Sequence, residues 1–201
     1  MVVREMVDLA GFNPAFNYPY SLRLEDFAGA MQDIYDFFYD VNRLFEQRSL
    51  PRLEETLRPA LMSGLISDML TASVAKHSRG LVQNRYHNGH PDLIVGGVYA
   101  NDSVKSGQQG IEIKTTRRKG AAVDTHGGRD QNMCVFVYEI DSTTQPAINR
   151  RATRFTAVYL SEVLAADFRR NPRGELGTPT STLGREGIAR FRQMWVYRPT
   201  S

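Results

Sequence analysis

Residues 110–116 read Gly-Ile-Glu-Ile-Lys-Thr-Thr, and the alternation of apolar and polar side chains in this segment decides how the fold is interpreted. Alternation of this kind is typical of a β-strand with one buried face. In such a strand Ile111 and Ile113 point to the core, and Glu112 and Lys114 lie side by side on the opposite face. The sequence therefore predicts a strand that presents an acid and a base together at a sheet surface.

Other strands are predicted on both sides of this segment. Residues 133–140 form an almost wholly apolar run rich in valine and aromatic residues, which is typical of a central strand covered on both faces. The single cysteine, Cys134, lies in this run and is expected to be a small buried core residue. Shorter strand patterns occur at 93–95 with 97–99, at 155–160 and at 191–197.

The first third of the chain has the period of helices instead. Between residues 24 and 47 apolar and aromatic side chains recur every three or four positions, as in an amphipathic helix. Pro51 opens a short helical piece, and Pro59 opens a longer helix that extends to about His77.

The C-terminal part is predicted to be mixed. Ser161 can cap a helix that continues to about Arg170, because Glu162 and apolar residues follow it at once. Residues 171–187 are rich in Pro, Gly, Thr and Ser, and a loop is expected there.

The order of helices, strands and mixed tail predicts an α/β or α+β fold with a mixed central sheet flanked by helices. With 201 residues, 41% of them hydrophobic, the chain can bury the core of one domain. Within that domain we expect a mainly helical part over 1–80, a sheet core over 81–160 and a basic C-terminal part over 161–201.

Several classes of protein are not supported by the sequence. No run of eighteen apolar residues occurs, and the first ten residues carry charges where a signal peptide would be apolar. No glycine-rich phosphate loop is present, so no nucleotide cofactor is expected. These observations predict a cytoplasmic protein without a membrane segment.

Charge is distributed unevenly along the chain. Residues 1–68 contain six arginines, no lysine and eleven acidic residues, whereas residues 142–201 contain ten arginines and four acidic residues. Arginine suits bidentate contact with phosphates and guanine edges, so a polyanionic partner is plausible. A solvated basic surface explains the same bias.

The candidate chemistry depends on three residues. Asp92, in the sequence His90-Pro91-Asp92, introduces the strand that precedes residues 110–116, and a hairpin can return Glu112 to its side. Two carboxylates would then flank Lys114. Such oxygen ligands suit Mg²⁺, which keeps several waters and binds through one or two carboxylates together with a substrate phosphate. Lys114 could position or deprotonate the attacking water.

Pro91-Asp92 followed by Glu112-Ile113-Lys114 resembles the signature of the PD-(D/E)xK nucleases. Together with the helical first third, residues 88–94 look most like type II restriction endonucleases. The resemblance implies a restriction-endonuclease-like mixed sheet, Mg²⁺-dependent hydrolysis of double-stranded DNA at specific sites, and a homodimer. It assigns the metal to Asp92 and Glu112, and it covers about residues 68–140.

A further acidic residue is implied by the same resemblance, because family members often add one from a helix before the first strand. Asp68 stands in a suitable place. Glu54 and Glu55 compete with it for this role.

The segment after the catalytic strand is rich in side chains that read bases and phosphates. A flexible basic surface loop is the alternative interpretation. The candidates for contact with DNA are Arg117, Arg118, Lys119, His126, Arg129, Gln131 and Asn132. His90 is expected to pack or to form a hydrogen bond near the active centre.

Two other functions remain open at this stage. The same centre could serve DNA repair, junction resolution or transposition, because one fold supports several activities. Alternatively, the carboxylates could be structural, in a DNA-binding module that does not cleave. The aromatic stripe of residues 24–47 is either core or a dimer interface.

Overall fold

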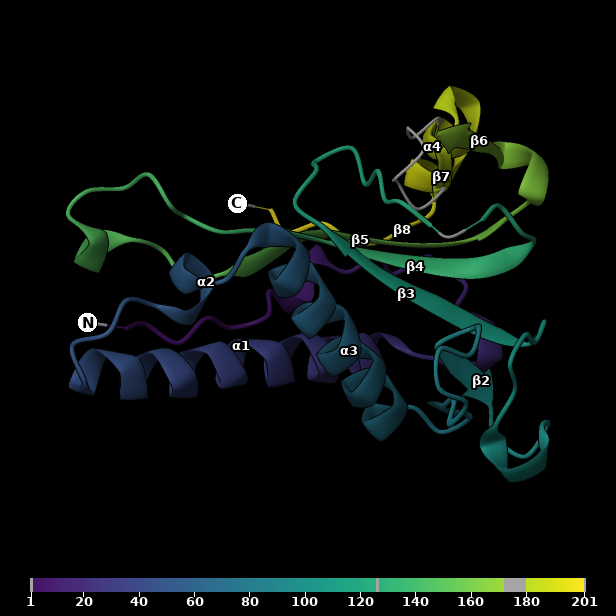
Figure 1. Ribbon diagram of the computed structural model, residues 1–201, viewed down its shortest axis with the longest axis horizontal. Coiled ribbons are helices and arrows are strands. Elements are labelled where there is room, and N and C mark those ends of the chain that lie inside the picture. Colours follow the sequence, from purple (N-terminus) through teal and green to yellow (C-terminus); the bar gives the residue numbers. More distant parts are fainter. Residues whose placement is uncertain (1, 126, 172–179, 201) are drawn as a thin grey trace.

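The computed structural model describes residues 2–125, 127–171 and 180–200, and it contains a six-stranded sheet with helices on both sides (Figure 1). The helices are α1 (Leu24–Gln47), α2 (Leu53–Thr56), α3 (Pro59–His77) and α4 (Arg185–Gln193). Short 3-10 helices occur at Leu9–Gly11, Pro19–Ser21, Ala100–Asp102, Ala147–Asn149 and Ala165–Asp167. None of the helices described has the length and apolarity needed to cross a membrane.

The strands are β1 (Leu81–Gln83), β2 (Leu93–Val95), β3 (Gly110–Thr116), β4 (Gln131–Glu139), β5 (Arg154–Val163), β6 (Phe168–Asn171), β7 (Thr180–Leu183) and β8 (Trp195–Tyr197). The main sheet has the order β1-β2-β3-β4-β5-β8, and β6 pairs with β7 separately. Strands β3 and β4 are parallel, whereas the other neighbours are antiparallel. The predicted mixed sheet in an α/β chain is therefore confirmed.

Helices α1 and α3 cover one face of the main sheet (Figure 1). Both helices begin and end at the residues that the sequence pattern indicated, and their apolar side chains meet Ile111, Ile113 and Phe136 in one core cluster. The stripe of α1 is buried in this cluster from Phe27 to Phe38. Most of the stripe is thus core, and it is not free to form a dimer interface.

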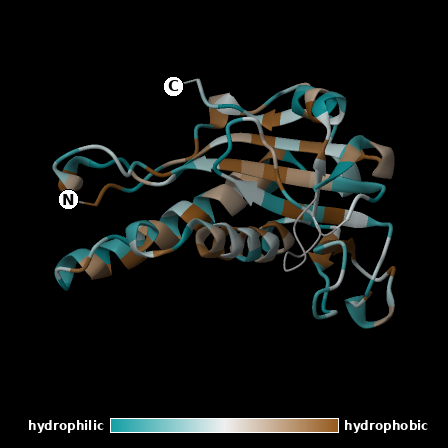
Figure 2. Cartoon of the chain, turned by 45° about the horizontal axis from the view of Figure 1, so that its top comes forward, coloured by the Kyte–Doolittle hydropathy of each residue, from teal (hydrophilic) through white to brown (hydrophobic). Residues whose placement is uncertain are grey.

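The opposite face of the sheet has a second, smaller core. Met133 and Val135 on β4 pack there with Phe191 of α4, and in Figure 1 α4 lies beyond this face together with β6 and β7. Residues 133–138 are buried throughout, so the prediction of a central strand covered on both faces is confirmed, as is the burial of Cys134. Apolar residues concentrate on the central strands, whereas the peripheral loops are largely hydrophilic (Figure 2).

The strand expected over residues 93–99 ends early. Strand β2 stops at Val95, and Gly96 and Gly97 follow in a turn in which Gly97 has a positive φ of 77°. Val98 is exposed, so its apolar side chain does not belong to the sheet. Strand β1 pairs with the outer edge of β2 and was not predicted. Its three residues are too few to show the alternation of a strand.

The helix predicted from Ser161 to Arg170 is wrong. Ser161 and Glu162 continue β5, because the ladder with β4 extends to the pair Gln131 and Val163 and buries Val163 in the second core. The chain then makes the 3-10 helix Ala165–Asp167 and strand β6. The pattern of Ser and Glu before apolar residues suits a helix start equally well, and tertiary pairing decided the outcome.

The C-terminal predictions were wrong in two further places. The loop expected over 171–187 contains β7 and the start of α4, and residues 172–179 of that loop lie outside the described residues. The strand expected over 191–197 begins only at Trp195. Phe191 belongs to α4, where it shares a buried face with Gly187 one turn earlier, so the period there is helical.

Candidate active site

Asp92 lies directly before β2, at the point where the pairing of β2 with β3 ends. Its carboxylate takes the place of a strand partner, because Ile113 N–H donates to Asp92 Oδ2 at 2.8 Å. On the same residue, the Ser67 hydroxyl of α3 donates to Ile113 O at 3.2 Å. Side chains from two other elements therefore hold the backbone of β3 at Ile113.

Gly110 determines how closely β2 approaches β3. Its φ is 155°, and a Cβ atom at this position would lie 1.9 Å from Leu93 O and 2.6 Å from Pro91 Cγ. Any side chain would push the two strands apart. The short separation between Asp92 and β3 thus depends on this glycine.

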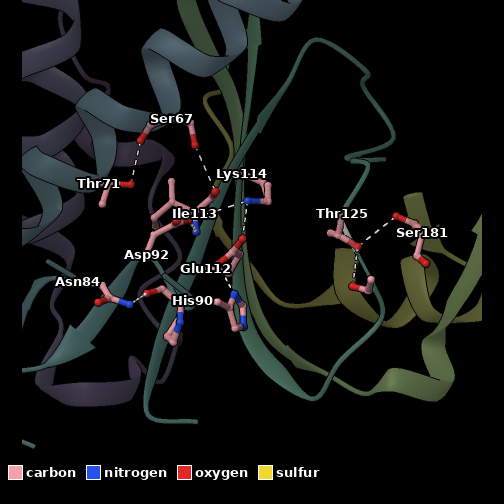
Figure 3. Close-up of polar contacts among 12 residues, drawn as sticks. Ser67, Thr71, Asn84, His90, Asp92, Glu112, Ile113, Lys114, Thr125 and Ser181 are labelled. Carbon is pink, nitrogen blue, oxygen red and sulfur yellow. Dashed lines mark hydrogen bonds and ion pairs between the residues drawn. The ribbon is translucent and has the colours of Figure 1, made fainter. Parts of the chain in front are cut away.

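Glu112 and Lys114 lie on the face of β3 that points away from α1 and α3, as the alternation predicted. Lys114 Nζ donates to Glu112 Oε1 at 2.5 Å and lies 3.9 Å from Asp92 Oδ2 (Figure 3). One ammonium group is thus within reach of both carboxylates. The structure brings together the three residues that the sequence singled out.

His90 completes a chain of contacts in this centre. Its Nδ1 lies 2.6 Å from Glu112 Oε2, so the two carboxylate oxygens of Glu112 are held by different side chains (Figure 3). The imidazole is buried, and the backbone of His90 is fixed by Lys105 O and Gly107 N. The expectation of a hydrogen bond near the active centre is confirmed for His90.

Asn84 fastens the segment that carries His90 and Asp92. Its Nδ2 donates to Pro91 O at 3.0 Å and to Val104 O at 2.8 Å, and its Oδ1 accepts from Val104 N at 3.0 Å. Sequence reasoning missed this residue. Its partners lie 7 and 20 positions away, and no local pattern indicates that they meet.

The surroundings of the two carboxylates shift their pKa values in opposite directions. Burial and the charge of Glu112 raise the pKa of Asp92 to about 6. Burial also opposes ionisation of Glu112, but the hydrogen bond from His90 and the charge of Lys114 outweigh it and lower the pKa of Glu112 to about 2. Burial likewise acts against the Lys114 ammonium, yet Glu112 and Asp92 raise its pKa. At neutral pH the centre therefore contains an ionised Glu112 and a protonated Lys114.

These residues line a cleft of about 730 Å³. Lys105 and Ser106 also line this cleft, as do Thr125, Arg129 and Gln131. Thr125 is paired with Ser181 of β7 through two backbone hydrogen bonds of 2.8 Å, and in Figure 3 this pair lies to the right of Glu112 and Lys114. The β6–β7 unit is thereby attached to the wall of the cleft.

Asp68 is exposed on α3 and does not line this cleft. It lines a neighbouring hollow of about 340 Å³, which shares Asn88, Gly89 and Asp92 with the cleft. Asp92 therefore stands between the main cleft and the hollow that contains Asp68.

The two competing glutamates are engaged elsewhere. Glu54 is buried and accepts from Asn42 Nδ2 at 2.7 Å, and Glu55 pairs with Arg150 at 2.7 Å. Neither of them lines the cleft or the neighbouring hollow. Of the three acidic candidates, only Asp68 lies near Asp92.

The candidate DNA-contacting residues are distributed over three places. Arg129 and Gln131 line the cleft, whereas Asn132 faces the helical side of the sheet and donates to Tyr20 Oη at 3.1 Å. The turn after β3 exposes its three cations outside the cleft. These cations are Arg117, Arg118 and Lys119. His126 lies outside the described residues.

The residues present fit a hard cation in part. Asp92 and Glu112 supply two neighbouring carboxylates in a cleft, which is the protein contribution that Mg²⁺ usually takes while keeping its waters. Over residues 2–125, 127–171 and 180–200, no group of three or more His, Cys, Asp and Glu side chains is arranged to hold a metal.

Comparison of the chain with models of known protein families, with curated proteins and with solved structures finds no match in any of the three.

Proposed function

We propose that this protein is a Mg²⁺-dependent nuclease of the PD-(D/E)xK type with a restriction-endonuclease-like fold, which hydrolyses phosphodiester bonds of double-stranded DNA at specific sites. The observation that carries the proposal is the meeting of Asp92, Glu112 and Lys114 in one cleft, with Lys114 Nζ 2.5 Å from Glu112 and 3.9 Å from Asp92. Two carboxylates with a cation between them suit the hydrolysis of a phosphodiester.

Asp92 and Glu112 would hold the metal ion. When bound, Mg²⁺ polarises a phosphoryl oxygen and lowers the pKa of a bound water. Both carboxylates must be ionised for this role, and Glu112 is kept so by His90 and Lys114. Asp92 ionises only near pH 6, so metal binding is expected to strengthen as the pH rises through that value.

Lys114 would act as a hydrogen-bond donor. Because Glu112 and Asp92 raise its pKa against the effect of burial, the ammonium form predominates at neutral pH. A protonated lysine can orient the attacking water and offset the charge that develops on the phosphate, but it cannot take a proton from that water.

The surroundings of the centre support a nucleic-acid substrate. Lys105 and Arg129 both line the cleft, and neither forms an ion pair within the described part of the chain. Unpaired cations that line a cleft suit a polyanionic substrate. The hollow beside Asp68 extends this region on the far side of Asp92.

A homodimer is part of the proposal, because the described residues form one such centre per chain. Cutting both strands requires two centres or two successive binding events, and a palindromic site matches two-fold symmetry. Light scattering of the protein bound to a duplex that it cleaves should give the molar mass of two chains and one duplex.

The first experiment is incubation of the purified protein with phage or plasmid DNA, with and without Mg²⁺, followed by electrophoresis. Discrete fragments that vanish with EDTA are expected. A branched duplex tested in parallel identifies a junction-resolving activity if it alone is cut.

Absence of cleavage on duplex, branched and single-stranded DNA would contradict the proposal. Salt-sensitive binding without any cleavage would instead indicate a DNA-binding module with structural carboxylates.

A further inference from the structure

Gln131 opens strand β4 on the same face of the sheet as the candidate catalytic residues. Met133 lies opposite Glu112 in the parallel ladder, and Gln131 precedes Met133 by two positions, so its side chain points to the same face. Gln131 lines the cleft together with Glu112 and Lys114. The residue is only 8% exposed, and its amide is therefore part of the cleft floor.

The amide of Gln131 has no partner within the described part of the chain. Its Oε1 is enclosed and accepts no hydrogen bond, and no hydrogen bond involves its Nε2 either. The other amides near the centre are engaged: Asn84 uses both ends, and Asn132 donates to Tyr20. Burying an amide without a partner destabilises a fold, and such groups in native proteins need a reason.

The cations around Gln131 indicate which ligand its unpaired NH₂ group would meet. Lys105, Lys114 and Arg129 line the same cleft as Gln131. An amide NH₂ group among three cations offers donors to an anion with several oxygens.

We infer that Gln131 is a substrate-binding residue, whose amide donates to a backbone phosphate of the bound DNA strand and fixes its position over Asp92 and Glu112. The inference rests on the proposed function. It adds a contact that carries no sequence information, so it should hold for every duplex that enters the cleft.

Gln131→Met and Thr153→Val form the matched pair that tests the inference. Thr153 is also buried, and its Oγ1 also lacks a partner, but it lines a separate small cavity near Tyr35 and Asn42. Both substitutions remove an unpartnered polar atom, and both variants are expected to unfold at the wild-type Tm or above it.

Only Gln131→Met should affect DNA. Binding is measured by fluorescence anisotropy with a mixed-sequence duplex of about 30 base pairs in Ca²⁺, and cleavage is measured on plasmid DNA in Mg²⁺. Gln131→Met is expected to bind roughly tenfold or more weakly, as for loss of a hydrogen bond to a charged group, while Thr153→Val stays within about twofold of wild type. Wild-type binding and cleavage by Gln131→Met would overturn the inference.

Gln131→Glu tests the phosphate itself. At a pH of about 8 the added carboxylate repels a phosphate, so this variant should bind the duplex more weakly than Gln131→Met. Binding as tight as that of wild type would overturn the inference, and it would do so even if Gln131→Met failed to fold.

The two proposals fail in different ways. If the wild-type protein binds DNA but cuts none, the nuclease proposal fails and the affinity comparison still decides the role of Gln131. If the wild-type protein cuts DNA and Gln131→Met cuts it equally fast, only the role of Gln131 fails. No binding by the wild-type protein overturns both.

Discussion

The two faces of the main sheet differ in how they are closed. On the side of α1 and α3 the sheet residues Ile111, Ile113 and Phe136 are buried in one large core cluster with apolar helix side chains, and the layer is closed. On the other side the second core is smaller, and the sheet opens beyond it into a cleft floored by Glu112, Lys114 and Gln131. The same strands thus contribute stability on one face and ionisable groups on the other.

This difference teaches that strand alternation separates two tasks within a single β-strand. Ile111 and Ile113 belong to the sealed face, and Glu112 and Lys114 between and beside them belong to the open face. Substitutions on the two faces should therefore fail in different ways: one set should reduce activity at constant stability, and the other should reduce stability at constant activity per folded molecule.

The largest expected effect is on the open face. Lys114→Ala should reduce the rate of DNA cleavage roughly 10²- to 10⁴-fold, because it removes the donor beside the reacting phosphate. Duplex binding should change little. The control is Lys76→Ala, which breaks an exposed pair with Asp33 in the helical layer. Wild-type cleavage rates in Lys114→Ala, measured on plasmid DNA, would sink the proposed chemistry.

A substitution on the sealed face should lower the stability of the fold. Phe136 is fully buried and packs against Phe27 and Phe155. Phe136→Ala should lower the free energy of unfolding by about 3–5 kcal/mol, as for other large-to-small substitutions in cores. Denaturant unfolding measures this loss, and cleavage per folded molecule should stay near that of wild type. A loss under about 1 kcal/mol would mean that this face is not the main core.

His90 offers a smaller effect within the open face. His90→Ala frees Glu112 Oε2, and both Mg²⁺ affinity and cleavage should fall roughly 10- to 100-fold, as is typical for side chains that orient metal ligands. His90→Asn should recover part of both, because its amide can donate from a similar position. Calorimetric Mg²⁺ titration provides the readout, and His77→Ala in the helical layer is the matched control. Equal Mg²⁺ affinity in all variants would remove His90 from this role.

The smallest expected effect is a gain in stability on substitution of Asp92. Because burial raises the pKa of Asp92 from 3.8 to about 6, the ionised form is disfavoured in the folded metal-free protein, and stability is lost as the pH rises through 6. Asp92→Asn keeps an oxygen for the Ile113 N–H. At a pH of about 8 it should raise the free energy of unfolding by roughly 1–2 kcal/mol, reduced from the full shift because the side chain is 30% exposed.

The pH dependence checks the sign of this prediction. Below pH 4 both proteins carry a neutral group at position 92, so the difference in stability between Asp92→Asn and wild type should vanish there. Added Mg²⁺ should raise the Tm of wild type alone. A variant less stable than wild type at neutral pH would show that the Asp92 carboxylate supports the fold instead of straining it.

The sequence predicted the elements whose pattern is long and regular. Helices α1 and α3 extend over 24 and 19 residues, and their periodic apolar positions were sufficient to place both ends. The end of β5 and the start of α4 could not be placed. Val163 pairs with β4, Phe191 packs against Tyr159 of β5, and Gly187 lies against Asp167, so partners distant in sequence determine these boundaries.

The candidate site could be predicted to a similar extent. Glu112 and Lys114 are two positions apart on one strand, so alternation alone places them together. Other features of the site follow from contacts across the fold and not from local pattern. These are the position of Asn84, the hydrogen bond from Ser67 to Ile113 O and the buried amide of Gln131. Asn132 was also misplaced, because the strand was expected to begin at Met133. Strand β4 begins at Gln131, and alternation from there turns the Asn132 amide to the other face of the sheet.

The backbone amide of Ile113 can report the state of the Asp92 carboxylate. Its proton is donated to Asp92 Oδ2, so the NMR chemical shift and the hydrogen-exchange rate of this amide should report whether that carboxylate is protonated, ionised or bound to a cation. The isotope-labelled protein thus contains a built-in spectroscopic probe at its candidate active centre, and metal occupancy could be followed there without any DNA present.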